Sequence, residues 1–513
     1  MSDLTRRQVV RGGAAAALGL LLPSGLAGSA LGARRRSPAR ARSDRRALEE
    51  LRRRLKGALL LPGEPGYTLA SQPANTRYQD VRPLAAAQCV DEHDVVTCVR
   101  WSNEHGVRPV ARNGGHSYAG YSTTRGLVID LALLAKVELD AATATATLGG
   151  GTTNHEVFEA THGGELVLPG GTCPSVGVGG LTLGGGIGYN THWAGLTCDR
   201  LRASRIVAAS GELLELDESH HRDLLWACRG GAGGSFGINT RFTFELARLP
   251  QPEVAFYRFD YAGAEAAEAI LPAFDRMLQT APTELNAVAM SRATPIGQGE
   301  GPRDAIATFS RGQYLGPIDE LREIVEPLTQ VANPWKIVLE TLPFWKAQEI
   351  LTTQEGALHS FGDISRYSRA PLPADVVAQV VGLLAECPSR EAGNNGSVWS
   401  LGWVGGAKVD SIARRETAYV HRGALTLLRA TPVWETNADA TIKDGLDRWS
   451  KAVIATIAPH TLRESYQNFP NRAIGDWKRE YYAENFDRLV EIKTKYDRRD
   501  VFHNAQSIPP LVA

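Results

Sequence analysis

The chain of 513 residues is long enough for two or three subdomains, each with its own hydrophobic core. Its composition, 43% apolar and 22% charged residues, is that of an ordinary soluble globular protein, and apart from the N-terminal residues no apolar run approaches the roughly 18 residues of a membrane span. The formal net charge is +0, yet residues 1–56 carry 14 basic and four acidic side chains, which leaves −10 for residues 57–513. This acidic body argues against nucleic acid as a partner.

The N-terminal residues have the pattern of an export signal. The pair Arg6 and Arg7 precedes the weakly apolar run 12–22, and small residues continue to Ala33. This order resembles a twin-arginine signal peptide over residues 1–33 and predicts a secreted, periplasmic or cell-envelope protein without an integral membrane span. A frayed basic tail with a chance arginine pair is the alternative. Residues 34–74 then form a basic linker and helix, either a solvated tether or a contact to anionic lipid or cell wall.

Hydrophobic spacing predicts the first elements of the folded body. Residues 44–56 are expected to be a helix that ends at Gly57, and residues 59–82 a loop rich in proline and glycine. Asp91 is the expected N-cap of a helix over residues 91–105. Further strands are expected at 107–111, 127–131, 136–140, 143–148 and 241–246, helices at 154–162 and 219–228, and a hairpin at 206–209 and 213–216.

From about Pro250 the pattern changes to longer amphipathic helices that alternate with strands. Helices are expected at 262–279, 318–329, 374–386 and 441–457, and a strand at 305–309. This alternation indicates an α+β substrate domain. The tail is expected to be helical over 477–496 and extended over 497–510.

Three glycine-rich segments carry the chemistry of the first half. Arg112-Asn113-Gly114-Gly115-His116-Ser117 follows a predicted strand, and its glycines permit a nest of backbone N–H groups that can hold a pyrophosphate. Gly170-Gly171-Thr172-Cys173-Pro174-Ser175-Val176-Gly177 leads into a second run, 179–188, and the third run is 230–238. Taken singly, the alternatives are a tight turn, a hydrogen-bonded histidine and a small buried cysteine.

Together and in this order, these segments resemble those of the berberine bridge enzyme-like oxidases, which have an FAD-binding domain of the p-cresol methylhydroxylase type. The resemblance implies an α+β fold: a two-subdomain FAD-binding domain over 75–250, a substrate domain with an antiparallel sheet over 251–460, and a C-terminal segment, 461–513, that returns to the FAD domain. It also implies FAD bonded covalently through His116 to the 8α-methyl carbon and through Cys173 to C6. Two such bonds fix the ring and raise its oxidising power.

The resemblance carries the cofactor-binding role to named positions. The C-terminal Tyr481-Tyr482-Ala483-Glu484-Asn485 matches the family's order, and Val176 is the small residue that leaves room for oxygen, which favours an oxidase that releases hydrogen peroxide. The predicted cofactor-binding residues are His116, Cys173, Arg112, Asn113, Gly114, Gly115, Ser117, Val176, Gly179, Gly180, Gly185, Gly186, Ile238, Tyr482 and Asn485. The six cysteines form no zinc pattern, so no metal is expected.

The catalytic base is where the chain departs from the family. In Tyr466-Gln467-Asn468-Phe469 the second tyrosine of the family's Y-x-N-Y segment is replaced, and Ser411 stands where plant members carry a glutamate. The candidate bases are Tyr466 first, then Tyr118 and Asp410. The small-molecule substrate is therefore open among sugars, secondary-metabolite alcohols and amine-bearing aromatics. A dehydrogenase with an acceptor other than molecular oxygen, and a non-catalytic flavoprotein, are the alternatives.

Overall fold

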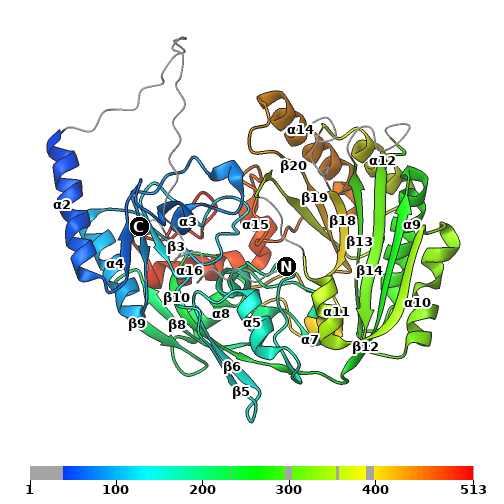
Figure 1. The fold of residues 1–513 in the computed structure, drawn as a ribbon, viewed down its shortest axis with the longest axis horizontal. Coiled ribbons are helices and arrows are strands. Elements are labelled where there is room, and N and C mark those ends of the chain that lie inside the picture. The colour runs from blue at the N-terminus through cyan, green and yellow to red at the C-terminus, as the bar shows by residue number, and fades with distance from the viewer. Residues whose placement is uncertain (1–37, 232, 295–302, 354–357, 389–397, 512–513) are drawn as a thin grey trace.

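The computed structural model describes residues 38–511 except 232, 295–302, 354–357 and 389–397. The predicted signal peptide, residues 1–33, lies outside the described residues. Two lobes lie side by side, with the N-terminal half of the chain in one and a large sheet with its helices in the other (Figure 1). Among the helices described, none is both long and apolar enough to cross a membrane.

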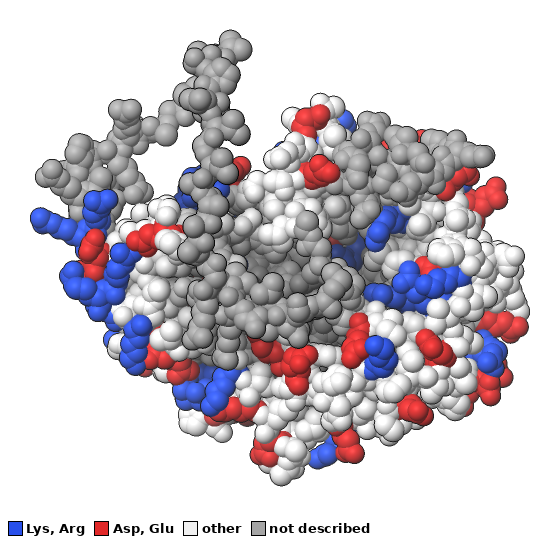
Figure 2. All heavy atoms as spheres, viewed as in Figure 1, with Lys and Arg blue, Asp and Glu red and all other residues white. Residues whose placement is uncertain are grey.

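The first lobe begins with a basic helix on its outer edge. Helix α2 (Pro38–Arg54) starts earlier than the expected 44–56 and packs against α4 (Glu92–His105), with Leu48 and Leu51 buried. Lys and Arg side chains gather at this end of the molecule (Figure 2). The expected cap of α4 is confirmed, because Asp91 Oδ1 accepts a hydrogen bond from Asp94 N at 3.0 Å.

A four-stranded sheet leads the chain to the first glycine-rich segment. Its order is β1-β2-β4-β3, and β2, β4 and β3 are parallel. Because these strands are buried, their sequences are short runs of apolar residues. The expected loop 59–82 contains part of β1 and a short helix, α3 (Tyr67–Ser71). The strands are β1 (Ala58–Leu60), β2 (Ala85–Gln88), β3 (Pro109–Arg112) and β4 (Leu127–Asp130).

The second sheet of this lobe has five antiparallel strands in the order β5-β6-β10-β8-β9. The predicted hairpin is β8 with β9, joined through a turn in which Gly211 has φ +79°. The run 179–188 was expected only as glycine-rich, yet it contains most of a short helix, α6. The elements are β5 (Val137–Asp140), β6 (Thr145–Gly149), α5 (Asn154–Thr161), α6 (Val178–Leu183), β8 (Leu201–Ala208), β9 (Leu213–Leu216), α8 (Arg222–Cys228) and β10 (Gly237–Glu245).

The second lobe is an antiparallel sheet of seven strands with four long helices on one face and α11 (Phe344–Leu351) on the other (Figure 1). Alternate residues of β12, β13, β14 and β19 pack into an apolar core with α9, α10, α12 and α14, so the residues between them face the first lobe. The strands, in sheet order, are β15 (Lys336–Pro343), β12 (Glu253–Ala262), β14 (Ile306–Tyr314), β13 (Leu285–Ala293), β18 (Val398–Trp403), β19 (Thr426–Thr431) and β17 (Ile364–Ser368). The helices are α9 (Ala264–Thr280), α10 (Ile318–Val331), α11 (Phe344–Leu351), α12 (Ala374–Ala385) and α14 (Ala440–Ile457).

The C-terminal segment packs against the first lobe. The helix expected over 477–496 is divided at Ala483, whose φ is +41°, into α15 (Trp477–Tyr482) and α16 (Phe486–Tyr496). Lys493 is fully buried, pairs with Asp497 at 2.6 Å and donates to the carbonyl oxygens of Ser235 and Phe502. These bonds hold the tail against the third glycine-rich segment.

Candidate active site

A cavity of about 600 Å³ lies between the glycine-rich segments of the first lobe and the open face of the seven-stranded sheet. This volume falls within the range typical of cofactor and small-molecule sites. Its walls come from parts of the chain far apart in sequence. They include residues 113–118, the Cys173 loop, α6, Gly231, residues 233–235 and 237–239, strands β13, β14 and β19, and the tail segment 466–470.

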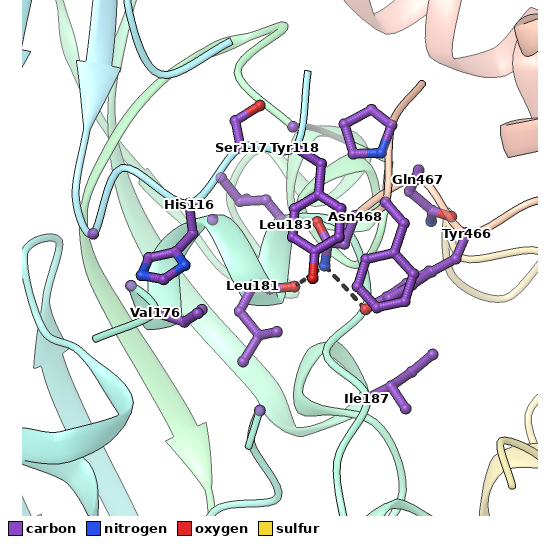
Figure 3. A pocket seen from close by; sticks show the side chains of 18 of the residues that line it. His116, Ser117, Tyr118, Val176, Leu181, Leu183, Ile187, Tyr466, Gln467 and Asn468 are labelled. Carbon is purple, nitrogen blue, oxygen red and sulfur yellow. Dashed lines mark hydrogen bonds between the residues drawn. The ribbon is translucent and has the colours of Figure 1, made fainter. Parts of the chain in front are cut away.

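His116 and Cys173, the two predicted attachment points, line this same cavity although they are 57 positions apart in the chain. His116 Nε2 lies 2.6 Å from Ser175 Oγ in the Cys173 loop. The backbone of that loop is held by Asn154 Nδ2, which donates to the Cys173 carbonyl oxygen at 2.9 Å. Figure 3 shows His116 beside Val176 on one side of the view, with Tyr466 and Gln467 on the other.

The glycines of the first segment are required by close packing of backbone against backbone. A Cβ on Gly114 would lie 2.3 Å from the Ser175 carbonyl oxygen, and a Cβ on Gly177 would lie 2.3 Å from Asn113 Cγ. Gly115 has φ +78°, a left-handed conformation that other residues adopt at a cost. The Cys173 loop can therefore approach residues 113–116 only while these positions are glycine.

Several polar groups of this wall have no partner among the described residues. The N–H groups of Gly114 and Gly115, both buried, donate no hydrogen bond there. Asn113 donates through Nδ2 to the carbonyl oxygens of Gly150 and Thr152, while its buried Oδ1 accepts nothing. Buried polar groups without partners are rare in folded proteins, so this wall is built to bind a polar ligand.

Of the other predicted cofactor residues, one group lines the cavity and another supports it from behind. Arg112 is buried behind Gly115, lies 3.5 Å from Asp130 Oδ1 and donates to the Gln72 carbonyl oxygen, so it does not reach the cavity as a countercharge. Asn485 does not line the cavity, and its Nδ2 donates to the Arg414 carbonyl oxygen. Those that line it are Asn113, Gly114, Gly115, Ser117, Val176, Gly179, Gly180, Ile238 and Tyr482, whereas Arg112, Gly185, Gly186 and Asn485 do not.

Tyr466, the first candidate base, is held by two donors in a buried aromatic cluster. Its hydroxyl oxygen accepts a hydrogen bond from Gly186 N at 2.9 Å. It also accepts one from Asn468 Nδ2 at 3.0 Å (Figure 3). The ring is 2% exposed, and burial raises the pKa of its hydroxyl well above the ordinary value. Gly186 thus helps the site by fixing this tyrosine.

Tyr118, the second candidate, lies beside a positive charge. Its ring stacks on Phe469 with 5.0 Å between centroids, and Arg429 Nη2 lies 3.4 Å from its hydroxyl oxygen. Arg429 also lies over the Phe469 ring, 3.9 Å from its centroid. Burial raises the pKa of Tyr118 to about 12, and the guanidinium opposes that rise.

Asp410, the third candidate, is outside the cavity. Its carboxylate accepts from the backbone N–H groups of Gly423 at 2.8 Å and Gly406 at 3.3 Å, so it stabilises a loop. The expectation that Asp410 could act as a base does not agree with this placement. Ser411 likewise donates to the Lys408 carbonyl oxygen away from the cavity.

Known proteins match the chain over nearly its full length. Residues 83–217 match the FAD binding domain family, and residues 465–509 match the family described as berberine and berberine like. The FAD-linked oxidoreductase YgaK of Bacillus subtilis (strain 168) is 30% identical, over 89% of this chain and 98% of that protein. The chain belongs to the berberine bridge enzyme-like family of FAD-linked oxidoreductases.

More distant relatives and solved structures agree with this berberine bridge enzyme-like assignment. The glucooligosaccharide oxidase of Sarocladium strictum is 26% identical over 87% of this chain and 91% of its own. The structure of berberine bridge enzyme-like 28 from Arabidopsis thaliana superimposes with a TM-score of 0.79 at 24% identity, covering 91% of this chain and 100% of that one. The predicted α+β fold, an FAD-binding domain with an antiparallel-sheet substrate domain, is confirmed. The expectation of an FAD-dependent oxidoreductase is also confirmed, and the non-catalytic alternative is set aside.

The cavity of this berberine bridge enzyme-like protein fits FAD. The unused N–H groups of Gly114 and Gly115 suit phosphate oxygens. A Cβ added to Gly180 or Gly234 would meet no atom within 4 Å, so both glycines leave free space at the wall.

Sequence reasoning did not find three charged residues of the sheet. Asp363, Arg429 and Arg311 stand on or beside three different strands, and Arg429 Nη2 lies 2.6 Å from Asp363 Oδ2. A single charged residue in a strand carries no local signal of its role, because neighbours across the sheet decide what it faces. The one available signal was the alternation of polar and apolar residues along each strand, which separates the open face from the core face.

Proposed function

We propose that this oxidoreductase is an exported oxidase with FAD bonded covalently through His116 and Cys173. It oxidises an alcohol or an activated C–H group of a small molecule and passes the electrons to O2, releasing H2O2. The observation that carries the covalent linkage is that both residues line one cavity, with His116 Nε2 within 2.6 Å of the Cys173 loop. Val176 beside them supports the oxidase, as do relatives that are oxidases by name.

The protein side of the reaction centres on a proton acceptor. Bound FAD would accept a hydride at N5 and return the electrons to O2. Tyr118 takes the hydroxyl proton of the substrate, because it is the candidate that lines the cavity and has a guanidinium within 3.4 Å of its oxygen. Arg429 stabilises the phenolate form that a base requires.

Tyr466 has a supporting role in this proposal. Its oxygen already accepts two hydrogen bonds, its ring is almost fully buried and no cation lies at hydrogen-bond distance from it in the described chain. It fixes Asn468 and Gly186, and through them the tail segment and the glycine run. Tyr118 therefore precedes Tyr466 as the base, which reverses the order expected from sequence.

Mass spectrometry of the exported protein tests the two covalent bonds. After acid denaturation, the wild type should keep the mass of one FAD, His116→Ala and Cys173→Ala should each keep a fraction of it, and the double variant none. Ser175→Ala, which keeps both nucleophiles, is the matched control and should retain FAD. Release of all pigment from the wild type by acid would refute the linkage.

Export and the electron acceptor need separate tests. Replacing both Arg6 and Arg7 by Lys should leave flavin-containing protein inside the cell, if residues 1–33 direct twin-arginine export. Turnover should consume O2 and release H2O2 in equal amounts. Turnover that requires an artificial acceptor and consumes no O2 would make the protein a dehydrogenase.

A further inference from the structure

The charges on the cavity wall are of one sign. Among the described residues that line the cavity, none is Asp, Glu or Lys, and the two with a permanent charge are Arg311 and Arg429. Both come from the sheet side, on β14 and β19, opposite the glycine-rich segments. A substrate that enters between the lobes therefore meets positive charge and no compensating acid from these residues.

The two arginines differ in how their charge is balanced. Arg429 is neutralised by Asp363, a buried carboxylate that also accepts from Thr431 Oγ1 at 2.8 Å. Arg311 has no acidic partner within ion-pair distance in the described part of the chain. Its guanidinium donates to Tyr189 Oη at 3.0 Å and to the carbonyl oxygen of Leu351 at 3.2 Å, both neutral acceptors.

Arg311 is also held in place. Its guanidinium lies 5.5 Å from the ring centroids of both Tyr189 and Phe309. Gln313, two residues after Arg311 on β14, donates through Nε2 to the Tyr189 carbonyl oxygen. This bond holds Tyr189 against the same strand that carries Arg311. A guanidinium that is clamped by neutral groups and lines a cavity is prepared to bind an anion, because little side-chain entropy remains to be lost.

Most of the other sheet residues that line the cavity are apolar; the exception is Asn286, whose Oδ1 already accepts from His192 N at 3.0 Å. Val288, Met290, Phe309 and Leu427 line the cavity between and beside the arginines. An oligosaccharide would find few hydrogen-bond partners on this wall, and a protonated amine would be repelled by the unbalanced charge of Arg311. Of the substrate classes open from sequence, these properties favour a molecule with an apolar body and negative charge.

We infer that the substrate is a largely apolar carboxylate, and that Arg311 binds its carboxylate group. This inference rests on the proposed oxidase function, since it assigns the substrate class of that same site. The planar fork of a guanidinium matches the two oxygens of a carboxylate. Arg311 is connected to the Cys173 loop through one short segment: it donates to the Leu351 carbonyl oxygen, and the N–H of Thr353, two residues further along the chain, donates to the Thr172 carbonyl oxygen at 2.9 Å.

Binding of inert probes to the FAD-loaded protein tests the inference without turnover. The probes are 3-phenylpropionate, its amide, 3-phenylpropylamine and cellobiose, with a phenylalkanoate series that varies chain length. Binding is followed by the change in flavin absorbance and by calorimetry. The best carboxylate should bind at least tenfold more tightly than its own amide, and the amine and cellobiose should bind more weakly than the amide.

Variants assign that preference to Arg311. Arg311→Gln should abolish the preference for carboxylate over amide and leave amide binding within twofold of the wild type, while Arg311→Lys should keep part of it. Arg258→Gln is the matched control: Arg258 is on the same sheet face and stacks on Phe309, but it is paired with Asp260 at 2.7 Å and should not affect the preference.

Three results would overturn the inference. They are tighter binding of the amine or cellobiose, equal binding of carboxylate and amide across the whole series in the wild type, and a preference that survives in folded Arg311→Gln. If Arg311→Gln does not fold, the wild-type series and Arg311→Lys decide. Failure of the oxidase function is a different result, namely no H2O2 from any bound carboxylate that carries an alcohol.

Discussion

Replacing Tyr118 by Phe tests the assignment of the base. The change removes the hydroxyl beside Arg429 and keeps the ring that stacks on Phe469. A positioned general base contributes about 10²- to 10⁴-fold, which corresponds to roughly 3–5 kcal/mol of the activation free energy. The rate of anaerobic flavin reduction should fall by that factor, while covalent flavin and thermal stability remain at the wild-type level.

The pH dependence provides the second readout. The pKa of Tyr118 is raised to about 12, so on the order of one molecule in 10⁵ is ionised at pH 7. If the phenolate is the base, the reduction rate should rise with pH through neutrality, up to tenfold per unit, because the ionised fraction rises. In Tyr118→Phe this slope should disappear. The measurement is stopped-flow flavin reduction between pH 6 and 9.

Two matched tyrosine variants complete the test. Tyr121 lines the same cavity, but its hydroxyl donates to Gln506 Oε1 at 2.9 Å, so Tyr121→Phe should keep both rate and pH slope. Tyr466→Phe should cost mainly stability, because Gly186 N and Asn468 Nδ2 lose their acceptor. Retention of the pH slope in Tyr118→Phe, or a larger loss of rate in Tyr466→Phe, would refute the assignment.

Of three further predictions, two concern stability and one concerns flavin loading. Lys493→Met leaves Asp497 charged and fully buried without its partner, so unfolding free energy should fall by about 3–5 kcal/mol in chemical denaturation, and an unchanged midpoint would contradict this. Burial raises the pKa of the Asp275 carboxyl from 3.8 to about 7, so the folded state loses stability as pH rises from about 4 to 7, by roughly 4 kcal/mol in all. Asp275→Asn removes that loss, still accepts from Leu372 N, and should melt higher than the wild type at pH 8 with little difference at pH 4. Gly114→Ala should reduce the flavin-to-protein absorbance ratio, because its Cβ would lie 2.3 Å from a carbonyl oxygen; a full flavin load would speak against that close approach.

Features that depend on local sequence could be predicted. The start of α4 was evident from Asp91, whose side chain caps the helix, and the hairpin of β8 and β9 was evident from two apolar runs around Gly211. The glycine-rich segments with His116 and Cys173 were evident because backbone contact to a ligand or another chain segment requires glycine at specific positions. In each case the signal lies within a few residues of the chain, although the close contact that requires Gly114 is made with Ser175, 61 positions away.

Other features were decided by tertiary structure alone. Tyr118 and Phe469 are 351 positions apart, and their stacking beside Arg429 follows from the return of the tail to the first lobe and from the register of β19. Side chains alternate between the two faces of β14, so Arg311 faces the cavity while its neighbours Ser310 and Gly312 face the other way. A shift of one residue in strand pairing would exchange these faces, and no local pattern in the chain reveals that register.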